Sequence, residues 1–364
     1  MQWNLHRLIR PDIEKMESYT PIVPFDVLSA RLGYPPHEIV KLDANENPYG
    51  PSPKIYQALA EERYYHIYPD PESHALRKGL SAYLNIAKEC ILAGSGADEL
   101  IDLILRLCVQ PGESIINCPP TFGMYSFLAS TCGGQVIRIP RLADFALDLT
   151  AIEHALASAQ PAKLLFVASP NNPDGRVVTD AELQRLLALP MLIVLDEAYV
   201  EFHGESRVAW VEQFPNLIVL RTFSKWAGLG GLRVGYGIFP PAIVEQLWKI
   251  KPPYNVNVAG SQAALASLAD RDTLMGNVTR LIDERERLYV ELERFGFLQP
   301  VPDSRANFIL CQVLGRDALQ LKLALEQQGV LVRHFAKPGL ENCIRISAGR
   351  PEDTERLLAA LGAV

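Results

Sequence analysis

The sequence lacks the features that mark membrane, secreted and nucleic-acid-binding proteins. No stretch approaches the eighteen apolar residues of a membrane span, and residues 1–19 have no apolar core of a signal peptide. Its 35 Lys and Arg do not exceed its 42 Asp and Glu, and the two signs are interspersed, which argues against a nucleic-acid surface. We therefore expect a cytoplasmic protein that acts on small molecules, with neither nucleic acid nor membrane as a partner.

Paired cysteines and metal-ligand motifs are also missing. The six cysteines form no C-x-x-C pair, and no H-E-x-x-H sequence occurs. The cysteines lie in or beside apolar stretches, which is typical of buried free thiols in a reducing compartment. We expect no metal site.

The loops that bind nucleotides and the elbow that carries a catalytic serine are absent too. The segment "MLIVLDE" (191–197) resembles the strand that holds magnesium in nucleotide hydrolases, but the chain has no G-x-x-x-x-G-K-[ST] loop. Neither glycine pair, at 94–96 or at 228–230, continues into a dinucleotide fingerprint, and G-x-S-x-G does not occur. The chain therefore lacks the motifs expected of an ATPase, a dehydrogenase or a serine hydrolase.

Short apolar runs alternating with helical segments are what the sequence does contain. A chain of 364 residues, 48% of them apolar, favours two domains. Helices are predicted at 97–109 and at 180–189, the second supported by a capping box at Thr179 and Glu182. Buried strands are predicted at 114–118, 135–139, 163–169, 191–197, 216–222 and 233–239. This alternation predicts an α/β fold around a mostly parallel sheet.

The pattern changes near residue 260, where a second and smaller α/β domain is expected. A long charged helix at 277–296 precedes a strand at 306–313, a helix at 317–329, strands at 330–335 and 343–349 and a last helix. We therefore expect a large domain and a smaller C-terminal domain. The predicted division is an N-terminal arm with part of the small domain at 1–45, a large domain at 46–258 and a small domain at 259–364.

Polar residues follow the predicted strands at the points where the strands end. They are Gly94 to Asp98, Pro170 to Pro173, Asp196 to Tyr199 and Arg221 to Lys225. Because ligands in such folds bind beyond the carboxyl ends of the strands, we expect these segments to converge on one edge of the sheet.

This combination suits pyridoxal phosphate, which needs a lysine amine for a Schiff base and an acid beside its pyridine nitrogen. Lys225 can supply the amine and Asp196 the acid, because a carboxylate keeps a nearby ring nitrogen protonated. The phosphate can be held by backbone amides at a helix N-terminus and by a hydroxyl and a guanidinium, namely at Gly96, Ala97, Asp98, Ser224 and Arg233. Tyr199 and Asn172 can hydrogen-bond the phenolic oxygen, and Phe122 can stack on the ring.

The sequence resembles the fold-type I aminotransferases, and among them the histidinol-phosphate aminotransferases. The similarity runs through nearly the whole chain, in "KLDANENPYGPSP", "YPDPESHALR", "GSGADELIDL", "CPPTFGMYSF", "SPNNPDG", "VLDEAYVEF", "RTFSKWAGLGGLRVGYG" and "CIRISAG". As a set these motifs are highly specific for the cofactor and less specific for the substrate. The resemblance implies a large domain with a mostly parallel mixed sheet between helices, plus a smaller C-terminal α/β domain.

The resemblance also implies roles for particular residues. Lys225 would form the Schiff base and transfer the proton, Asp196 would pair with the pyridinium, and Asn172 and Tyr199 would bind the phenolic oxygen. Tyr68 of a second subunit would reach the cofactor phosphate across a homodimer. The substrate-binding positions would be Tyr19, Asn45, Arg333 and Arg345. The reaction implied joins imidazole acetol phosphate and L-glutamate to histidinol phosphate and 2-oxoglutarate, within histidine biosynthesis.

Two alternatives within the same cofactor class share every expected cofactor contact. They are an aromatic amino-acid aminotransferase and a phosphothreonine decarboxylase, and relative turnover of phosphorylated substrates would separate them. A regulatory protein that binds pyridoxal phosphate would need a DNA-binding segment, and neither end of the sequence carries a basic helix-turn-helix.

Overall fold

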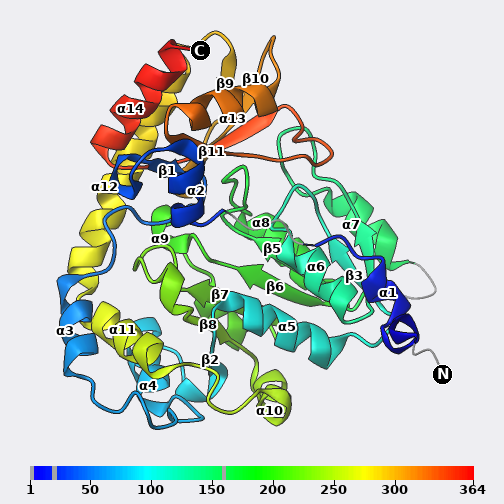
Figure 1. The fold of residues 1–364 in the computed structure, drawn as a ribbon. Helices are drawn as coiled ribbons and strands as arrows, with labels where there is room; N and C mark the ends of the chain where they lie inside the picture. Colours follow the sequence, from blue (N-terminus) through cyan, green and yellow to red (C-terminus); the bar gives the residue numbers. More distant parts are fainter. Residues whose placement is uncertain (1–3, 19–22, 158–160) are drawn as a thin grey trace.

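Two β-sheets organise the molecule (Figure 1). The larger has seven strands in the order β2-β8-β7-β6-β5-β3-β4, and the smaller has five in the order β1-β11-β12-β10-β9. The computed structural model describes residues 4–18, 23–157 and 161–364. Within these ranges, no helix has both the length and the apolar character that a membrane span requires.

The large sheet contains every strand that the apolar runs predicted for this part of the chain. β8 is antiparallel to both β7 and β2, and the other neighbouring pairs are parallel. Because β2 and β7 are both antiparallel to β8, they point in the same direction. The strands are β2 (Ile91–Gly94), β3 (Ser114–Asn117), β4 (Gln135–Arg138), β5 (Leu164–Ala168), β6 (Leu192–Asp196), β7 (Leu217–Thr222) and β8 (Gly235–Ile238). The expected mostly parallel mixed sheet is confirmed.

Helices cover both faces of this sheet, which explains why its strands read as continuous apolar runs. In β6, Ile193 and Leu195 belong to one apolar cluster and Val194 to another, because successive side chains point to opposite faces. The surrounding helices are α3 (Pro53–Glu61), α4 (His74–Leu84), α5 (Ala97–Cys108), α6 (Met124–Thr131), α7 (Leu149–Leu156), α8 (Asp180–Leu187), α9 (Val200–His203), α10 (Pro241–Ile250) and α11 (Val258–Ala269). α8 begins with the predicted capping box, in which Thr179 Oγ1 accepts a hydrogen bond from Glu182 N and the Glu182 carboxylate accepts one from Thr179 N.

The small sheet combines C-terminal strands with one strand from near the N-terminus. β1 (Val40–Leu42) pairs in parallel with β11 (Val330–His334), and this pairing brings residues 43–45 beside the small domain. The other elements are α2 (Phe25–Leu32), α12 (Arg271–Leu292), α13 (Ala318–Gln327), α14 (Pro351–Gly362), β9 (Leu298–Pro300), β10 (Phe308–Val313) and β12 (Cys343–Ser347), while a short α1 (Pro11–Glu14) lies nearer the N-terminus. β1 and β9 were not predicted, because three residues are too few to show a periodic pattern.

The long helix begins earlier than its charge pattern indicated. α12 begins at Arg271 rather than near Asn277, and it ends at Leu292. α11 begins at Val258, at the predicted domain boundary, and it packs against α3 and α4 of the large unit. The division at residues 45 and 258 stays a prediction.

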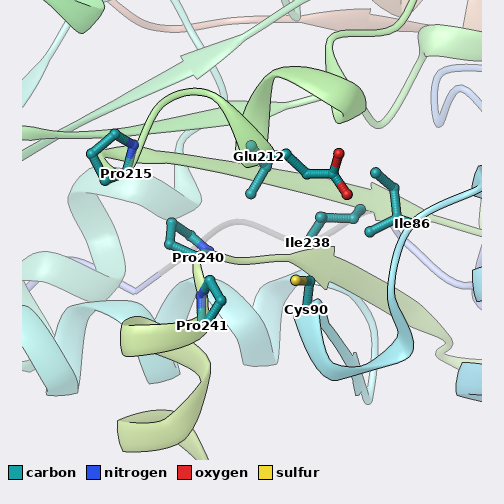
Figure 2. A pocket seen from close by; sticks show the side chains of 8 residues that line it. Ile86, Cys90, Glu212, Pro215, Ile238, Pro240 and Pro241 are labelled. Atoms are coloured by element: carbon teal, nitrogen blue, oxygen red, sulfur yellow. The ribbon is translucent and has the colours of Figure 1, made fainter.

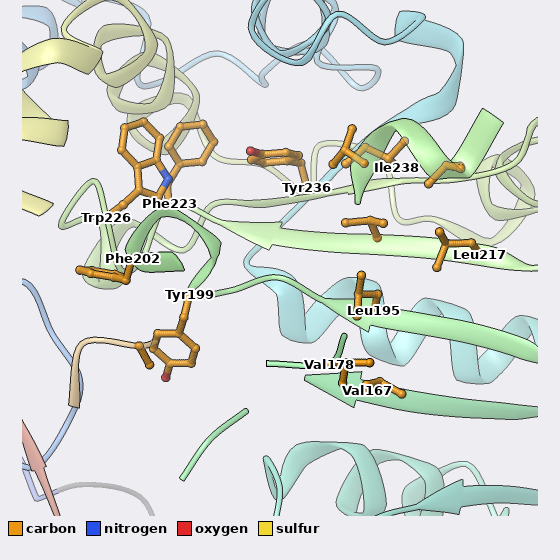
Figure 3. Close-up of a cluster of buried hydrophobic side chains, with 14 of the residues drawn as sticks. Val167, Val178, Leu195, Tyr199, Phe202, Leu217, Phe223, Trp226, Tyr236 and Ile238 are labelled. Carbon is orange, nitrogen blue, oxygen red and sulfur yellow. The ribbon is translucent and has the colours of Figure 1, made fainter. Parts of the chain in front are cut away.

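A cluster of aromatic side chains supports the segment that carries Lys225 (Figure 3). Phe223 and Trp226 are fully buried, and their rings lie 5.6 Å apart. Phe223 also packs against the buried ring of Tyr236. These rings anchor the chain on both sides of Ser224 and Lys225, so that the two polar side chains are held at the end of β7.

The six cysteines are all free thiols. Only Cys118 and Cys311 are buried, and the other four are partly exposed. The prediction of uniform burial was therefore wrong, because a position at the end of an apolar run lies at the margin of the core.

Candidate active site

The carboxyl ends of three strands bring the predicted site segments to one edge of the large sheet. β2 ends at Gly94, β6 at Asp196 and β7 at Thr222. Since the three strands point in the same direction, the loops that follow them lie side by side. This is the edge at which open α/β sheets bind ligands.

One end of the site is the N-terminus of α5, which has the properties of an anion site. Gly96 is its N-cap with a φ of 80°, and among the described residues no side chain caps the helix. A Cβ at Gly96 would lie 2.6 Å from Arg233 Nη2, so only glycine allows the guanidinium this close. The first amides of a helix have no partner within it and attract negative charge.

Further donors surround the same helix terminus. Arg233 Nη2 lies 3.1 Å from Asp98 Oδ2. Thr222 Oγ1 donates to Ser224 Oγ over 2.9 Å and accepts from Ser224 N over 3.0 Å. A helix N-terminus, a hydroxyl pair and a guanidinium together can bind a phosphate group.

The Asp196 carboxylate is buried, with 5% of its residue surface exposed. Burial raises its pKa to about 6, and hydrogen bonds from Tyr125 and from the Ala198 amide oppose that rise. The Tyr125 hydroxyl donates to Oδ2 over 2.6 Å, and Ala198 N donates to Oδ1 over 3.0 Å. A basic ring nitrogen placed here would be protonated and would form an ion pair with the carboxylate.

Tyr125 is a residue of the candidate site that reasoning from the sequence missed. Its ring is completely buried, stacks on Phe166 at 4.8 Å between centroids and meets Phe122 edge-on at 5.5 Å. The only signal was its position three residues after Phe122, which lies just before α6, whereas Tyr125 is in the first turn of that helix. Nothing in that spacing indicated that the hydroxyl meets Asp196, a residue 71 positions away.

Lys225 and Tyr199 lie together as predicted. The half-buried Lys225 amine is 5.6 Å from the centroid of the Tyr199 ring and 3.5 Å from the carbonyl oxygen of Ala44. The Tyr199 hydroxyl accepts a hydrogen bond of 2.9 Å from Asn45 Nδ2. The segment at 43–45 therefore touches both the lysine and the tyrosine.

Arg345 links the two domains across the site. Its Nη1 donates to Asn172 Oδ1 over 2.6 Å, and its Nη2 donates to the Asp43 carbonyl oxygen over 2.8 Å. Arg333 is its direct neighbour on β11, and both guanidinium groups lie within 6 Å of the Phe335 ring centroid, at 5.8 and 5.6 Å. Since Asn172 Oδ1 faces Arg345, its Nδ2 is the group left to donate elsewhere.

Tyr68, predicted to act in a second subunit, lies on the surface of its own chain. Tyr68 is 79% exposed and stacks on Tyr254 at 4.8 Å between ring centroids. Tyr19 lies outside the described residues. Phe122 is connected to the set through its contact with Tyr125.

A buried group of charged side chains that includes Glu197, the residue after Asp196, was also missed by the sequence analysis. Arg221 Nε lies 3.0 Å from Glu197 Oε2, and its Nη1 lies 3.9 Å from Glu201 Oε1. Burial raises the pKa of Glu201 to about 7. Glu197 and Glu201 lie in "VLDEAYVEF", and Arg221 lies in "LRTF". They were missed because the sequence motifs pointed to the neighbouring Asp196, Tyr199 and Lys225 instead.

A pocket of about 310 Å³ lies away from this site (Figure 2). Its mainly apolar lining comes from the start of β2, the end of β8 and the segment before β7, and includes Cys90, Glu212 and Pro215. These are the opposite ends of the strands from Asp196 and Lys225. The pocket is therefore separate from the convergent polar residues.

Known proteins share both the sequence and the fold of this chain. Residues 37–361 match the family described as aminotransferase class I and II. Histidinol-phosphate aminotransferase 1, chloroplastic, of Arabidopsis thaliana is 52% identical over 97% of this chain and 85% of its own. Histidinol-phosphate aminotransferase of Roseiflexus castenholzii is 48% identical over 97% of each chain. The crystal structure of histidinol-phosphate aminotransferase from Sinorhizobium meliloti, in complex with pyridoxal-5'-phosphate, superposes with a TM-score of 0.86 at 29% identity, covering 98% of this chain and 96% of that one.

Proposed function

The chain belongs to the class I and II aminotransferase family, and from this we infer that it transfers the amino group of L-histidinol phosphate to 2-oxoglutarate. The products are imidazole acetol phosphate and L-glutamate, and the reaction belongs to histidine biosynthesis. The observation that carries the substrate is the 52% identity over 97% of the chain to a histidinol-phosphate aminotransferase. This identity favours the histidinol-phosphate reaction over the aromatic amino-acid and decarboxylase alternatives.

Pyridoxal phosphate fits the donors that the site offers. The phosphate would be held by the amides at the start of α5, with Ser224 and Arg233. A Cβ on Gly96 would collide with the Arg233 guanidinium, and one on Gly235 would collide with the Ala97 amide. Asp196 would hold the pyridine nitrogen, Phe122 would cover one face of the ring, and the phenolic oxygen would accept hydrogen bonds. The donors of those bonds would be Tyr199 and Asn172. When bound, the cofactor supplies a carbonyl for the amine and a ring that accepts an electron pair from carbon.

Lys225 would act as both the attachment point and the proton carrier. Its Nζ lies within reach of the Tyr199 ring, at the end of the rigid strand β7. Nζ would take a proton from the amine-bearing carbon of the substrate and would deliver it to the carbon that receives the amino group. Positioned proton transfer of this kind typically contributes about 10²–10⁴-fold to the rate.

Arg345 and Arg333 would read the anionic end of each substrate. A guanidinium can bind a carboxylate or a phosphate through two parallel hydrogen bonds, so one site can accept glutamate and histidinol phosphate in turn. Asn45 would contribute an amide on the same side, and Tyr19 is proposed on the family resemblance alone.

We also propose a homodimer in which Tyr68 contributes to the partner's phosphate site. Exposed aromatic side chains gather around it, since Tyr64, Tyr65 and Tyr254 are also exposed. Within its own chain the Tyr68 ring stacks on Tyr254. A cytoplasmic location stays a prediction.

The test is an absorbance spectrum of the purified, cofactor-loaded protein. A visible band should be present, L-histidinol phosphate should remove it, and 2-oxoglutarate should restore it. Borohydride reduction followed by peptide mapping should find the cofactor on Lys225. L-phenylalanine and O-phosphothreonine, added as separate controls, should act far more slowly.

Three outcomes would contradict the proposal. A reduced adduct on another lysine would remove the role of Lys225. Faster turnover of phenylalanine would favour an aromatic aminotransferase, and release of CO₂ from phosphothreonine would favour a decarboxylase.

A further inference from the structure

Ser347 lies at the start of a chain of buried hydrogen bonds that ends at Tyr199. It is the last residue of β12 in the small domain, and 2% of its surface is exposed. Its hydroxyl oxygen is 2.9 Å from Asn45 N and 2.9 Å from Asn45 Oδ1. The Asn45 amide then reaches the Tyr199 hydroxyl in the large domain, with 2.9 Å between Nδ2 and the oxygen.

The direction of every bond in this chain follows from one backbone amide. Asn45 N–H can only donate, so Ser347 Oγ is its acceptor. The hydroxyl hydrogen of Ser347 is then free to donate to the other close atom of Asn45. In the structure that atom is the carbonyl oxygen Oδ1, which accepts the bond from Ser347.

The opposite orientation of the Asn45 side chain is disfavoured. If the amide were turned over, Ser347 Oγ would face two N–H donors, and its own hydrogen would lose the acceptor that it has in the structure, Asn45 Oδ1. A buried donor left without an acceptor destabilises the structure. The Asn45 backbone is fixed as well, because Asn307 Nδ2 donates to its carbonyl oxygen over 3.2 Å.

The orientation of Asn45 determines what the Tyr199 hydroxyl can do. Because Nδ2 donates to the Tyr199 oxygen, the tyrosine hydrogen cannot be used toward Asn45 and must point to another acceptor. Under the proposed function, that acceptor is the phenolic oxygen of the cofactor.

We propose that Ser347 is a positioning residue that fixes the Asn45 amide and thereby makes Tyr199 a hydrogen-bond donor to the cofactor. This inference rests on the proposed function and assigns to the small domain a part in tuning a group held by the large domain. A Ser347 without its hydroxyl would let the amide turn over, and Tyr199 would then donate to Asn45 Oδ1 instead.

The experiment follows the pH at which the visible band of the cofactor-loaded protein shifts. A donor to the phenolic oxygen stabilises its negative form and keeps that midpoint low, so losing the donor raises the midpoint. Tyr199→Phe sets the upper limit of the shift. Ser347→Ala should raise the midpoint by about half to one pH unit, as expected for a weakened hydrogen bond.

Two further variants separate positioning from general damage. Ser347→Thr keeps the hydroxyl and should restore the midpoint. Ser267→Ala removes an equally buried hydroxyl, one that donates within α11 to the Ala263 carbonyl oxygen, and should leave the midpoint unchanged. Thermal melting of each variant without cofactor measures any loss of stability separately.

The double variant Tyr199→Phe/Ser347→Ala is the decisive comparison. If Ser347 acts through Tyr199, the double variant has the same midpoint as Tyr199→Phe alone. An additive shift, or no shift in Ser347→Ala while Tyr199→Phe shifts, would overturn the inference. A protein with no visible band, or one in which Tyr199→Phe has no effect, would instead contradict the proposed cofactor site.

Discussion

At the scale of single residues, Asp196 shows how burial and hydrogen bonding act on one carboxylate in opposite directions. Burial alone favours the neutral acid, while Tyr125 and the Ala198 amide favour the ion. A protonated pyridine nitrogen would favour the ion further. The carboxylate is therefore suited to pair with a cation and poorly suited to remain charged without one.

Asp196→Asn should lose most activity while the protein still folds. The amide is nearly isosteric but carries no negative charge to hold the ring proton. Because a hydrogen bond to a charged group contributes about 1.5–3 kcal/mol, kcat should fall at least about ten- to a hundred-fold. Steady-state kinetics measures the loss, and the visible spectrum confirms that cofactor is retained. Turnover equal to that of the parent would make Asp196 a structural residue.

Arg345→Lys should weaken both half-reactions, because lysine keeps the charge but cannot bind a substrate carboxylate or phosphate through two parallel hydrogen bonds. We expect a loss of about 1.5–3 kcal/mol with each substrate. Single-turnover kinetics with histidinol phosphate and with glutamate measures it, and an unchanged visible band is the control. Unaltered rates and affinities for both would exclude Arg345 as the residue that reads the anion.

At the scale of elements, the contact between β8 and the start of α5 shapes the phosphate site. A Cβ at Gly235 would lie 2.5 Å from Ala97 N and 2.6 Å from the Gly96 carbonyl carbon. Both atoms are backbone, so the helix terminus would have to move. The strand and the helix are thus held at a separation that only glycine permits.

Gly235→Ala should therefore weaken cofactor binding by displacing the amides at the start of α5. We expect the dissociation constant for pyridoxal phosphate to rise about tenfold or more, equal to about 1.4 kcal/mol. Titration of the apoprotein by absorbance measures it. Gly231→Ala is the matched control, because a Cβ there meets no atom within 4 Å. Equal affinities in the two variants would contradict this account of the site.

The contact between α9 and β7 contains the buried Glu201, whose burial makes stability depend on pH. Its folded pKa of about 7 is above its ordinary value of 4.5, so its stabilising contribution is present below pH 4.5 and is lost as the pH rises through about 7. Glu201→Gln should therefore stabilise the apoprotein by about 1–3 kcal/mol at pH 8 and much less at pH 5.

Thermal unfolding at the two pH values tests this prediction. Arg221 keeps Glu197 as its partner in the variant, at 3.0 Å. Substituting the exposed Glu212 by Gln is the control, and it should leave the pH dependence as it is. A Glu201→Gln variant that is less stable than the parent at pH 8 would show that its attraction to Arg221 outweighs the effect of burial.

At the scale of the whole molecule, the site lies where two domains meet and is proposed to need a second subunit. We expect a mass in solution of twice the 40.4 kDa of one chain, measured by sedimentation. Tyr68→Phe should keep this mass but weaken cofactor binding about tenfold, because its hydroxyl would reach the partner's phosphate site. A monomeric protein with full cofactor affinity would exclude the shared site.

Much of the fold could be predicted from the sequence because its signals are local. Continuous apolar runs predicted β3 to β8, and the Thr179 capping box located the start of α8. The residues after the strands predicted which loops meet, since parallel strands end at the same edge. Lys225, Asp196 and Tyr199 followed from that rule and from the residue types that the cofactor chemistry requires.

The tertiary structure alone decided the contacts that join distant residues. Ser347 meets Asn45 across 302 positions of sequence, and Tyr125 meets Asp196 across 71. Neither hydroxyl differs in its local pattern from an ordinary core or strand residue, because a side chain's partner depends on how the elements pack. For the same reason the three residues of β1 show no strand signal of their own, and pairing with β11 gives them their structure. The sequence by itself determined most of the elements and the residue types at the proposed site, and packing determined which neighbours orient each of those side chains.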